Sequence, residues 1–135
     1  MRAFIVKLEN QPGSLADLAE ALGEKGINIT GVSGIGWDGS GAAGLITADE
    51  AGTRAVLGQR GLEFRESELV SAALEDRPGS LGMAARRLAD KGINVEALLP
   101  TGMSGSRITV AFAVDDPAAA REALGDLAAV GSQPV

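Results

Sequence analysis

Two short loops of the sequence carry residues that could bind the carboxylate of a small molecule. Residues 10–15 read NQPGSL and residues 76–81 read DRPGSL, and apolar residues at helical spacing follow the first of them. The first N–H groups of a helix have no acceptor within it, and that end of the helix favours anions. Beside them, the amide of Asn10 can donate to a carboxylate or accept from an ammonium group. These loops are therefore the candidate binding sites.

The candidate residues lie in these loops and at the start of the strand that follows each helix, a position that we expect to lie beside the loop. The first set is Asn10, Gln11, Gly13, Ser14, Leu15 and Asn28, and the second is Asp76, Arg77, Gly79, Ser80, Leu81 and Asn94. We expect the two sites to be unequal, because a carboxylate at Asp76 repels a ligand carboxylate where Asn10 does not. Arg77 can offset that charge. The first loop is the preferred site.

The composition excludes several kinds of chemistry. The chain has no cysteine, histidine or tyrosine, which removes disulfides, the commonest metal ligands and the usual general base. Without histidine, Ser14 and Ser80 have no evident base to activate them as nucleophiles, and helix capping explains both. We therefore predict a protein that is not an enzyme and that holds no metal and no cofactor.

The charge and the hydropathy limit the possible partners. Residues 1–66 and residues 67–135 each hold 6 Lys+Arg and 9 Asp+Glu, so each half carries a net charge of −3. This balance counts against nucleic acid and against anionic membranes as partners. No apolar run reaches the length of a membrane span, and a strand pattern starts at the N-terminus with no room for a signal peptide. A cytoplasmic location is expected.

The residues that position the two loops are themselves repeated. Residues 9–29 and 75–95 align without a gap, with 11 identities in 21 positions. The identities fall on turn, cap and core residues, which indicates a duplicated supersecondary unit. The predicted domains are therefore 1–66 and 67–135.

Periodicity predicts the order strand, helix, strand, strand, helix, strand in both halves. The first half is expected to hold strands at 4–8, 27–35, 43–47 and 62–66, with helices that begin near 14 and 50; the second half is expected to hold strands at 69–74, 93–99, 108–114 and 129–130, with helices that begin near 81 and 117. This order is typical of an α+β, ferredoxin-like unit, an antiparallel sheet with both helices on one face. Exposed sheet edges would let two units join side by side.

Several local features refine this scheme. Ser14 is expected to cap its helix, Gly26 to end it, and Leu15, Leu18, Ala19 and Leu22 to form its buried face. The spacing of the repeat grows from 66 to 67 residues, since Arg54 matches Arg121, so one residue is gained near positions 100–105. Residues 34–39 fit G-x-G-x-x-G, but strand-like residues follow them, so a hairpin tip is predicted rather than a dinucleotide site.

The pattern of a strand, E-N-x-P-G-S-L, a helix and K-G-I-N-I resembles the ACT domain, a module that senses small molecules in amino-acid metabolism. It occurs at residues 9–15 with 25–29 and again, as EDRPGSL and KGINV, at 75–81 with 91–95. The resemblance implies a stand-alone tandem ACT protein, a non-catalytic regulator that binds an amino acid between ACT units and forms a homodimer. Leu8 stands where many serine-binding members have histidine, so the resemblance does not imply serine as the ligand.

Two other functions remain open from the sequence. One is a regulatory subunit of a metabolic enzyme such as acetolactate synthase, whose small chain begins with a similar pattern; the near-equal repeats count against it. The other, more remote, is an enzyme resembling acylphosphatase, in which Arg77 would act before Gly79, but the glycine-containing phosphate loop of that family is missing.

Overall fold

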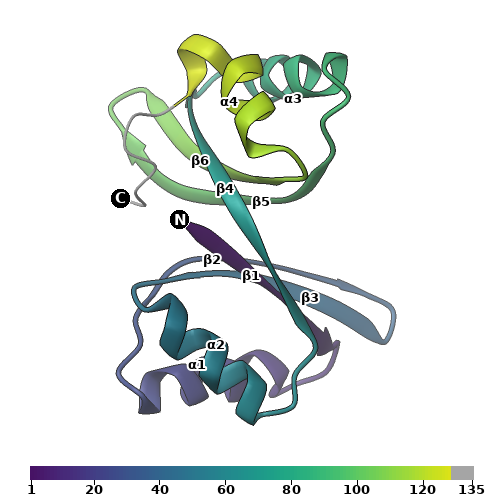
Figure 1. Cartoon of the computed structure of the whole chain (residues 1–135), viewed down its shortest axis with the longest axis vertical. Coiled ribbons are helices and arrows are strands. Elements are labelled where there is room, and N and C mark those ends of the chain that lie inside the picture. Colours follow the sequence, from purple (N-terminus) through teal and green to yellow (C-terminus); the bar gives the residue numbers. More distant parts are fainter. Residues whose placement is uncertain (129–135) are drawn as a thin grey trace. The chain divides into compact units, whose positions relative to one another are not determined.

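The computed structural model describes residues 1–128, which divide into two compact units. The N-terminal unit is Arg2–Glu66, and the C-terminal unit begins at Ser67 and includes Met1. Each unit is α+β, with antiparallel strands and two helices, as predicted (Figure 1). Within residues 1–128, no helix combines the length and the apolar character needed to cross a membrane.

The N-terminal unit packs two helices on one face of its sheet. Its elements are β1 (Arg2–Glu9), α1 (Ser14–Glu24), β2 (Ile29–Trp37), β3 (Ser40–Thr47), α2 (Glu50–Gln59) and the first residues of β4 (Phe64–Glu75). The strands lie in the order β2-β3-β1, with β4 next to β1. Phe4 and Leu45 of the sheet pack against Leu18 and Leu22 of α1 and Leu57 of α2 in one buried cluster.

The C-terminal unit repeats this arrangement. It consists of the rest of β4, then α3 (Ser80–Asp90), β5 (Val95–Ser104), β6 (Arg107–Val114), α4 (Pro117–Leu124) and a short 3-10 helix (Gly125–Leu127). Its strands lie in the order β4-β6-β5. Phe112 and Val70 of the sheet pack against Leu88 of α3 and Leu124 of α4.

The boundary between the two halves differs from the prediction. Two strands were expected, at 62–66 and 69–74, but a single strand, β4, runs from Phe64 to Glu75. The intervening residues include no glycine, proline or asparagine that could turn the chain, so the extended backbone continues. The predicted last strand at 129–130 lies outside the described residues, although Ala128 already bridges to Ala72.

The N-cap of the first helix in each unit lies one residue earlier than expected. Gly13, at φ 95°, is the N-cap of α1, and Gly79, at φ 91°, is the N-cap of α3. Ser14 and Ser80 are therefore the first helical residues, and neither helix has a side-chain cap. An L-residue in this left-handed conformation costs roughly 1–2 kcal/mol, which accounts for glycine at both positions.

The end of α1 follows the prediction. Gly26 has φ 69°, its N–H donates to the carbonyl of Gly23 (2.9 Å), and the N–H of Ile27 donates to that of Leu22 (3.0 Å). These two bonds are the Schellman motif, which fixes the entry into β2. The equivalent bonds of Gly92 and Ile93 end α3.

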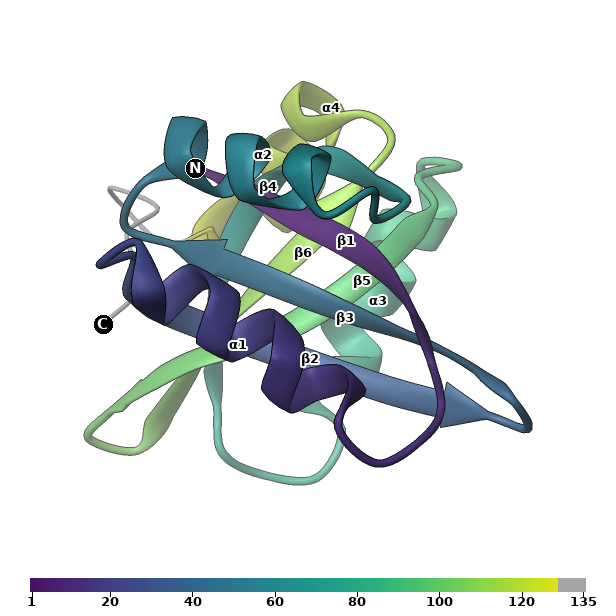
Figure 2. The ribbon, with the colours of Figure 1, turned by 90° about the horizontal axis from the view of Figure 1, so that it is seen from below.

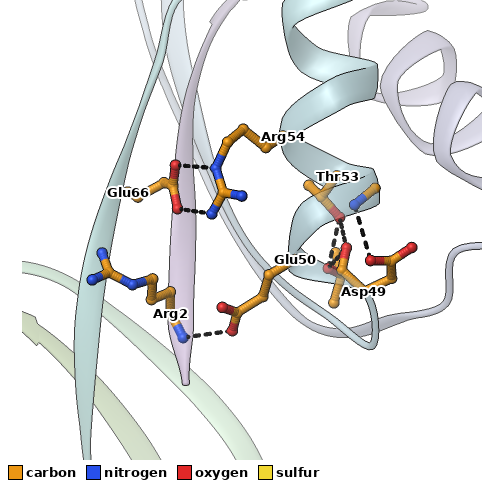
Figure 3. Close-up of polar contacts among 8 residues, drawn as sticks. Arg2, Asp49, Glu50, Thr53, Arg54 and Glu66 are labelled. Atoms are coloured by element: carbon orange, nitrogen blue, oxygen red, sulfur yellow. Dashed lines mark hydrogen bonds and ion pairs between the residues drawn. The ribbon is translucent and has the colours of Figure 1, made fainter.

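An ion pair joins α2 to β4 in the N-terminal unit. The guanidinium of Arg54 donates to both carboxylate oxygens of Glu66, at 2.7 and 2.6 Å (Figure 3). This hydrogen-bonded pair holds the pKa of Glu66 below its usual range. Nearby, Asp49 caps α2 by accepting from the N–H of Gly52 (2.9 Å), and the helix begins at Glu50, near the predicted position.

We expect Glu66→Gln to lower the free energy of unfolding at pH 7 and to have less effect in acid. A carboxylate whose pKa is lowered by folding stabilises the protein above its unfolded pKa, about 4.3 for glutamate, and loses that contribution as the pH falls through the lower folded value. Urea unfolding of wild type and variant at pH 7 and pH 3 measures the difference. Glu63→Gln is the matched control, because the Lys7–Glu63 pair is exposed and contributes little. A Glu66→Gln difference that stays constant across this range would contradict the prediction.

Candidate ligand-binding pocket

A pocket of about 420 Å³ lies in the N-terminal unit, between the loop that joins β1 to α1 and the β2–β3 hairpin. The loop and the start of α1 contribute Asn10, Gln11, Ser14 and Leu15, four of the six residues that the sequence predicted for this site. Figure 2 shows the loop and the hairpin tip at the same end of the unit. These four residues are therefore brought together around one hollow, whereas Gly13 and Asn28 do not line it.

Asn10 joins the loop to the β2–β3 hairpin through two hydrogen bonds. Its Nδ2 donates to the carbonyl of Asp38 (2.8 Å) and its backbone N–H donates to that of Gly39 (3.0 Å). A Cβ on Gly36 would lie 2.6 Å from this amide, so glycine is needed there for Asn10 to cross the strand. These bonds to the hairpin show that Asn10 first shapes the pocket. One amide hydrogen and Oδ1 of its side chain remain for a ligand.

The start of α1 offers free donors next to the pocket. Gly13 accepts from the N–H of Asp17 (2.8 Å), and the N–H of Ser14 makes a long contact of 3.4 Å with the carbonyl of Gln11. Within residues 1–128, the N–H groups of Leu15 and Ala16 have no acceptor. A ligand carboxylate at this helix end would satisfy them.

The remaining lining is almost uncharged. Glu9 is the only ionisable residue among those that line the pocket, and its carboxylate makes no hydrogen bond or ion pair within the described part of the chain. Its carboxylate can accept hydrogen bonds from an ammonium group. Free N–H groups and one carboxylate therefore match the two charges of a zwitterion.

The sequence did not predict the strand side of the pocket. Val32, Gly34 and Gly36 of β2, with Gly41 and Ala43 of β3, line it. The hairpin itself was predicted, and it is confirmed, with Asp38 and Gly39 at its tip. The small residues of both strands could have indicated a pocket, but the glycine pattern at 34–39 predicted only a hairpin tip.

Leu15 was expected in the buried face of α1 and does not belong there. Leu18, Ala21 and Leu22 form the buried face, whereas Leu15 is 56% exposed at the pocket rim. Leu81 is likewise exposed at the start of α3. In both helices the leucine of the first turn is therefore left at the surface, and the buried apolar residues begin farther along the helix.

The expectation that Asn28 and Asn94 lie beside the loops is wrong. Asn28 precedes β2 at the far end of α1, and the 11 residues of that helix span about 16 Å. It does not line the pocket. Asn94 occupies the same place after α3, where its N–H donates to Asp115 Oδ1 (3.1 Å). Both asparagines directly precede strands and contribute to local structure.

The second loop keeps the geometry of the first with different side chains. The N–H of Asp76 donates to the carbonyl of Ser106 (2.9 Å), as Asn10 does to Gly39, and Gly79 starts the helix. Asp76 and Arg77 are exposed, and Ser80 is buried. This loop has the same backbone but lacks the amide that crosses to the hairpin in the first unit.

A second pocket of about 340 Å³ lies on the other side of Ser14. It is lined by Lys7, Asp17 and Arg60, among others. Lys7 already pairs with Glu63 (3.1 Å) and Arg60 lies 3.9 Å from Glu24, so its cations are partly neutralised. Elsewhere in residues 1–128, no group of three acidic side chains is placed to bind a metal ion.

Comparison with known proteins identifies relatives of the fold only. No protein-family model matches the sequence, and no curated protein matches it significantly. Among solved structures, a protein from Bacteroides thetaiotaomicron is similar with a TM-score of 0.75 and 19% identity, over 94% of this chain and 91% of that one. The regulatory subunits of aspartate kinase from Thermus thermophilus and Thermus flavus have TM-scores of 0.64 and 0.63 and identities of 19% and 22%. These alignments cover 93% of this chain and 90% and 91% of theirs.

Proposed function

We propose that the chain is a non-catalytic regulator of amino-acid metabolism, built from two ACT domains at 1–66 and 67–135, and that an α-amino acid binds in the pocket of the N-terminal unit. The pocket carries the proposal: Leu15, which lines it, has a free N–H group for the carboxylate, with the free N–H of Ala16 next in the helix, and Glu9 is available for the ammonium group. The similar fold of two aspartate kinase regulatory subunits supports a regulatory role.

We also propose that a second copy of the chain covers the pocket. The pocket is open, and its lining residues Leu15, Val32 and Ile35 are all at least half exposed, as is Trp37 at the end of β2. Strand β2 lies at a sheet edge and contains neither a charged residue nor a proline, the usual protections of an edge. Pairing of two such edges in a homodimer would bury these apolar side chains and enclose the ligand between ACT units.

A thermal-shift screen with the twenty amino acids tests this function. An amino acid at about 100 times its dissociation constant should add about 2.7 kcal/mol to the stability of the protein. In the variant Ser14→Glu, a carboxylate beside the free N–H groups should repel the ligand and weaken its binding about tenfold or more, while the unliganded helix is as stable or more stable. If no amino acid raises the unfolding temperature of the wild-type protein, the proposed function is wrong.

A catalytic partner chain is the second candidate, since two of the similar structures are subunits of an enzyme. The chain would then regulate a biosynthetic enzyme rather than act alone. Copurification of one catalytic chain with the tagged protein, reversed by the bound amino acid, would favour this candidate over an independent homodimer.

A further inference from the structure

We propose that Gly34 determines the specificity of the pocket, by leaving the space that the uncharged aliphatic side chain of the ligand occupies. This inference rests on the proposed function, because it assigns a ligand class to the same site. It follows from the pairing of the strands, the chemistry of the lining, and a comparison with the second unit.

The strand register places small residues on the helix-facing side of the hairpin. Residues directly opposite each other in a sheet project to the same face. Gly34 pairs with Ala43, and Gly36 pairs with Gly41, which also pairs with Leu8. Ala43 belongs to the core cluster beneath the helices, so all of these positions face α1. The hollow therefore exists because three glycines and an alanine stand where larger side chains could.

The second unit carries larger residues at each of these positions. Pro100 pairs with Val110, and Met103 pairs with Ile108, which also pairs with Leu74. By these pairings, Pro100 and Val110 replace Gly34 and Ala43, while Met103 and Ile108 replace Gly36 and Gly41. The residue gained between the copies is Thr101, which lies at a bulge between Pro100 and Gly102, inside the predicted range. The side chains at the equivalent surface thus occupy the space that is open in the first unit.

Among the three glycines, Gly34 is the one whose lack of a side chain no backbone or loop contact requires, so only the open space of the pocket accounts for it. A Cβ on Gly36 would collide with Asn10, and one on Gly41 would lie 3.0 Å from the carbonyl of Ile35, so both are also required by the backbone or the loop. A Cβ on Gly34 would meet nothing nearer than 3.7 Å, and its φ is not in the left-handed region. The fold therefore tolerates a side chain at position 34, but that side chain would fill part of the pocket.

The side chains nearest to Gly34 on the helix-facing side are apolar, although the loop contributes polar residues to the same pocket. Ala43 lies directly opposite Gly34, and Leu8, Leu15 and Val32 line the same pocket. No lysine or arginine lines it, and its single carboxylate, on Glu9, is assigned to the ligand ammonium. A charged ligand side chain would lose its hydration here without a partner. The lining therefore fits alanine, valine, leucine or isoleucine and disfavours aspartate and glutamate.

Gly34→Val tests the assignment, with Ser40→Val as its control. Ser40 lies in the same hairpin but does not line the pocket, and it neighbours Gly41 in β3, so its side chain projects to the face opposite α1. Isothermal titration calorimetry with free L-alanine, L-valine, L-leucine, L-isoleucine, L-lysine and L-aspartate gives the affinities. We expect wild type and Ser40→Val to bind the aliphatic amino acids. We expect Gly34→Val to bind leucine and isoleucine about 10- to 200-fold more weakly, the range for one extra or missing methylene.

Stability measurements separate exclusion from misfolding. Gly34→Val should unfold at the same temperature as wild type or higher, because valine favours the strand more than glycine does. Undiminished binding of leucine and isoleucine by Gly34→Val, or binding of only lysine or aspartate by wild type, would overturn this inference and leave the proposed function standing. If wild type binds no amino acid, both are overturned.

Discussion

Replacing Leu22 with alanine is expected to lower the free energy of unfolding by about 2–5 kcal/mol, the range for a large-to-small change in a core. The Leu22 side chain is fully buried and belongs to the cluster that joins α1, α2 and the sheet. Its loss leaves a cavity under the helix whose first turn borders the pocket. Urea unfolding monitored by circular dichroism measures the change.

Leu15→Ala provides the matched control, since it is the same substitution in the same helix. Leu15 is 56% exposed, so its removal should change the stability by no more than about 0.5 kcal/mol. Because Leu15 lines the pocket, the same variant should weaken amino-acid binding. If Leu15→Ala destabilised the protein as much as Leu22→Ala, the assignment of Leu15 to the pocket rim rather than the core would be wrong.

Trp37→Lys is expected to dissociate the proposed homodimer. Trp37 ends the edge strand β2 and is 79% exposed in the isolated chain. Central tryptophans of interfaces contribute about 2 kcal/mol or more, and lysine on a sheet edge opposes pairing. The dimer dissociation constant should therefore rise about 30-fold or more, as measured by sedimentation velocity over a range of protein concentrations.

Met103→Lys is the control for this prediction, because Met103 lies on β5, the edge strand of the C-terminal unit, and is 64% exposed. Strand β5 contains Glu96, Pro100 and a bulge, features that discourage edge pairing. Trp37 is the only tryptophan, so its fluorescence reports burial directly. A dimer that Met103→Lys disrupts and Trp37→Lys leaves intact would show that the interface is elsewhere.

Much of the fold could be predicted because local rules encode it. The motif K-G-I-N ends α1 and α3 through the same two hydrogen bonds in both copies, and these involve residues only a few positions apart. The Asp38-Gly39 turn of the β2–β3 hairpin is equally local. Where local rules gave a wrong result, the cause was a competing local geometry: Gly13 in a left-handed conformation took the N-cap position that was assigned to Ser14.

The residues of the candidate site that local sequence could predict are those that lie close together in the chain. Asn10, Gln11, Ser14 and Leu15 could be found from the sequence, because they form one continuous loop and helix start. Asn28 could not be placed, since the length of α1 separates it from that loop. The inward or outward direction of Leu15 depends on where the helix leaves the core, which apolar spacing within the helix does not reveal.

The sequence by itself determined that one unit is present twice, that each copy carries a Pro-Gly loop before a helix, and that histidine and cysteine chemistry is absent. Only the tertiary structure decided that the first loop faces a hollow and that the small residues of the hairpin create it. The physical reason is that a pocket is the space left between side chains from separate strands and a helix. That space depends on the register in which β1, β2 and β3 pair, and no single segment of the chain contains this information.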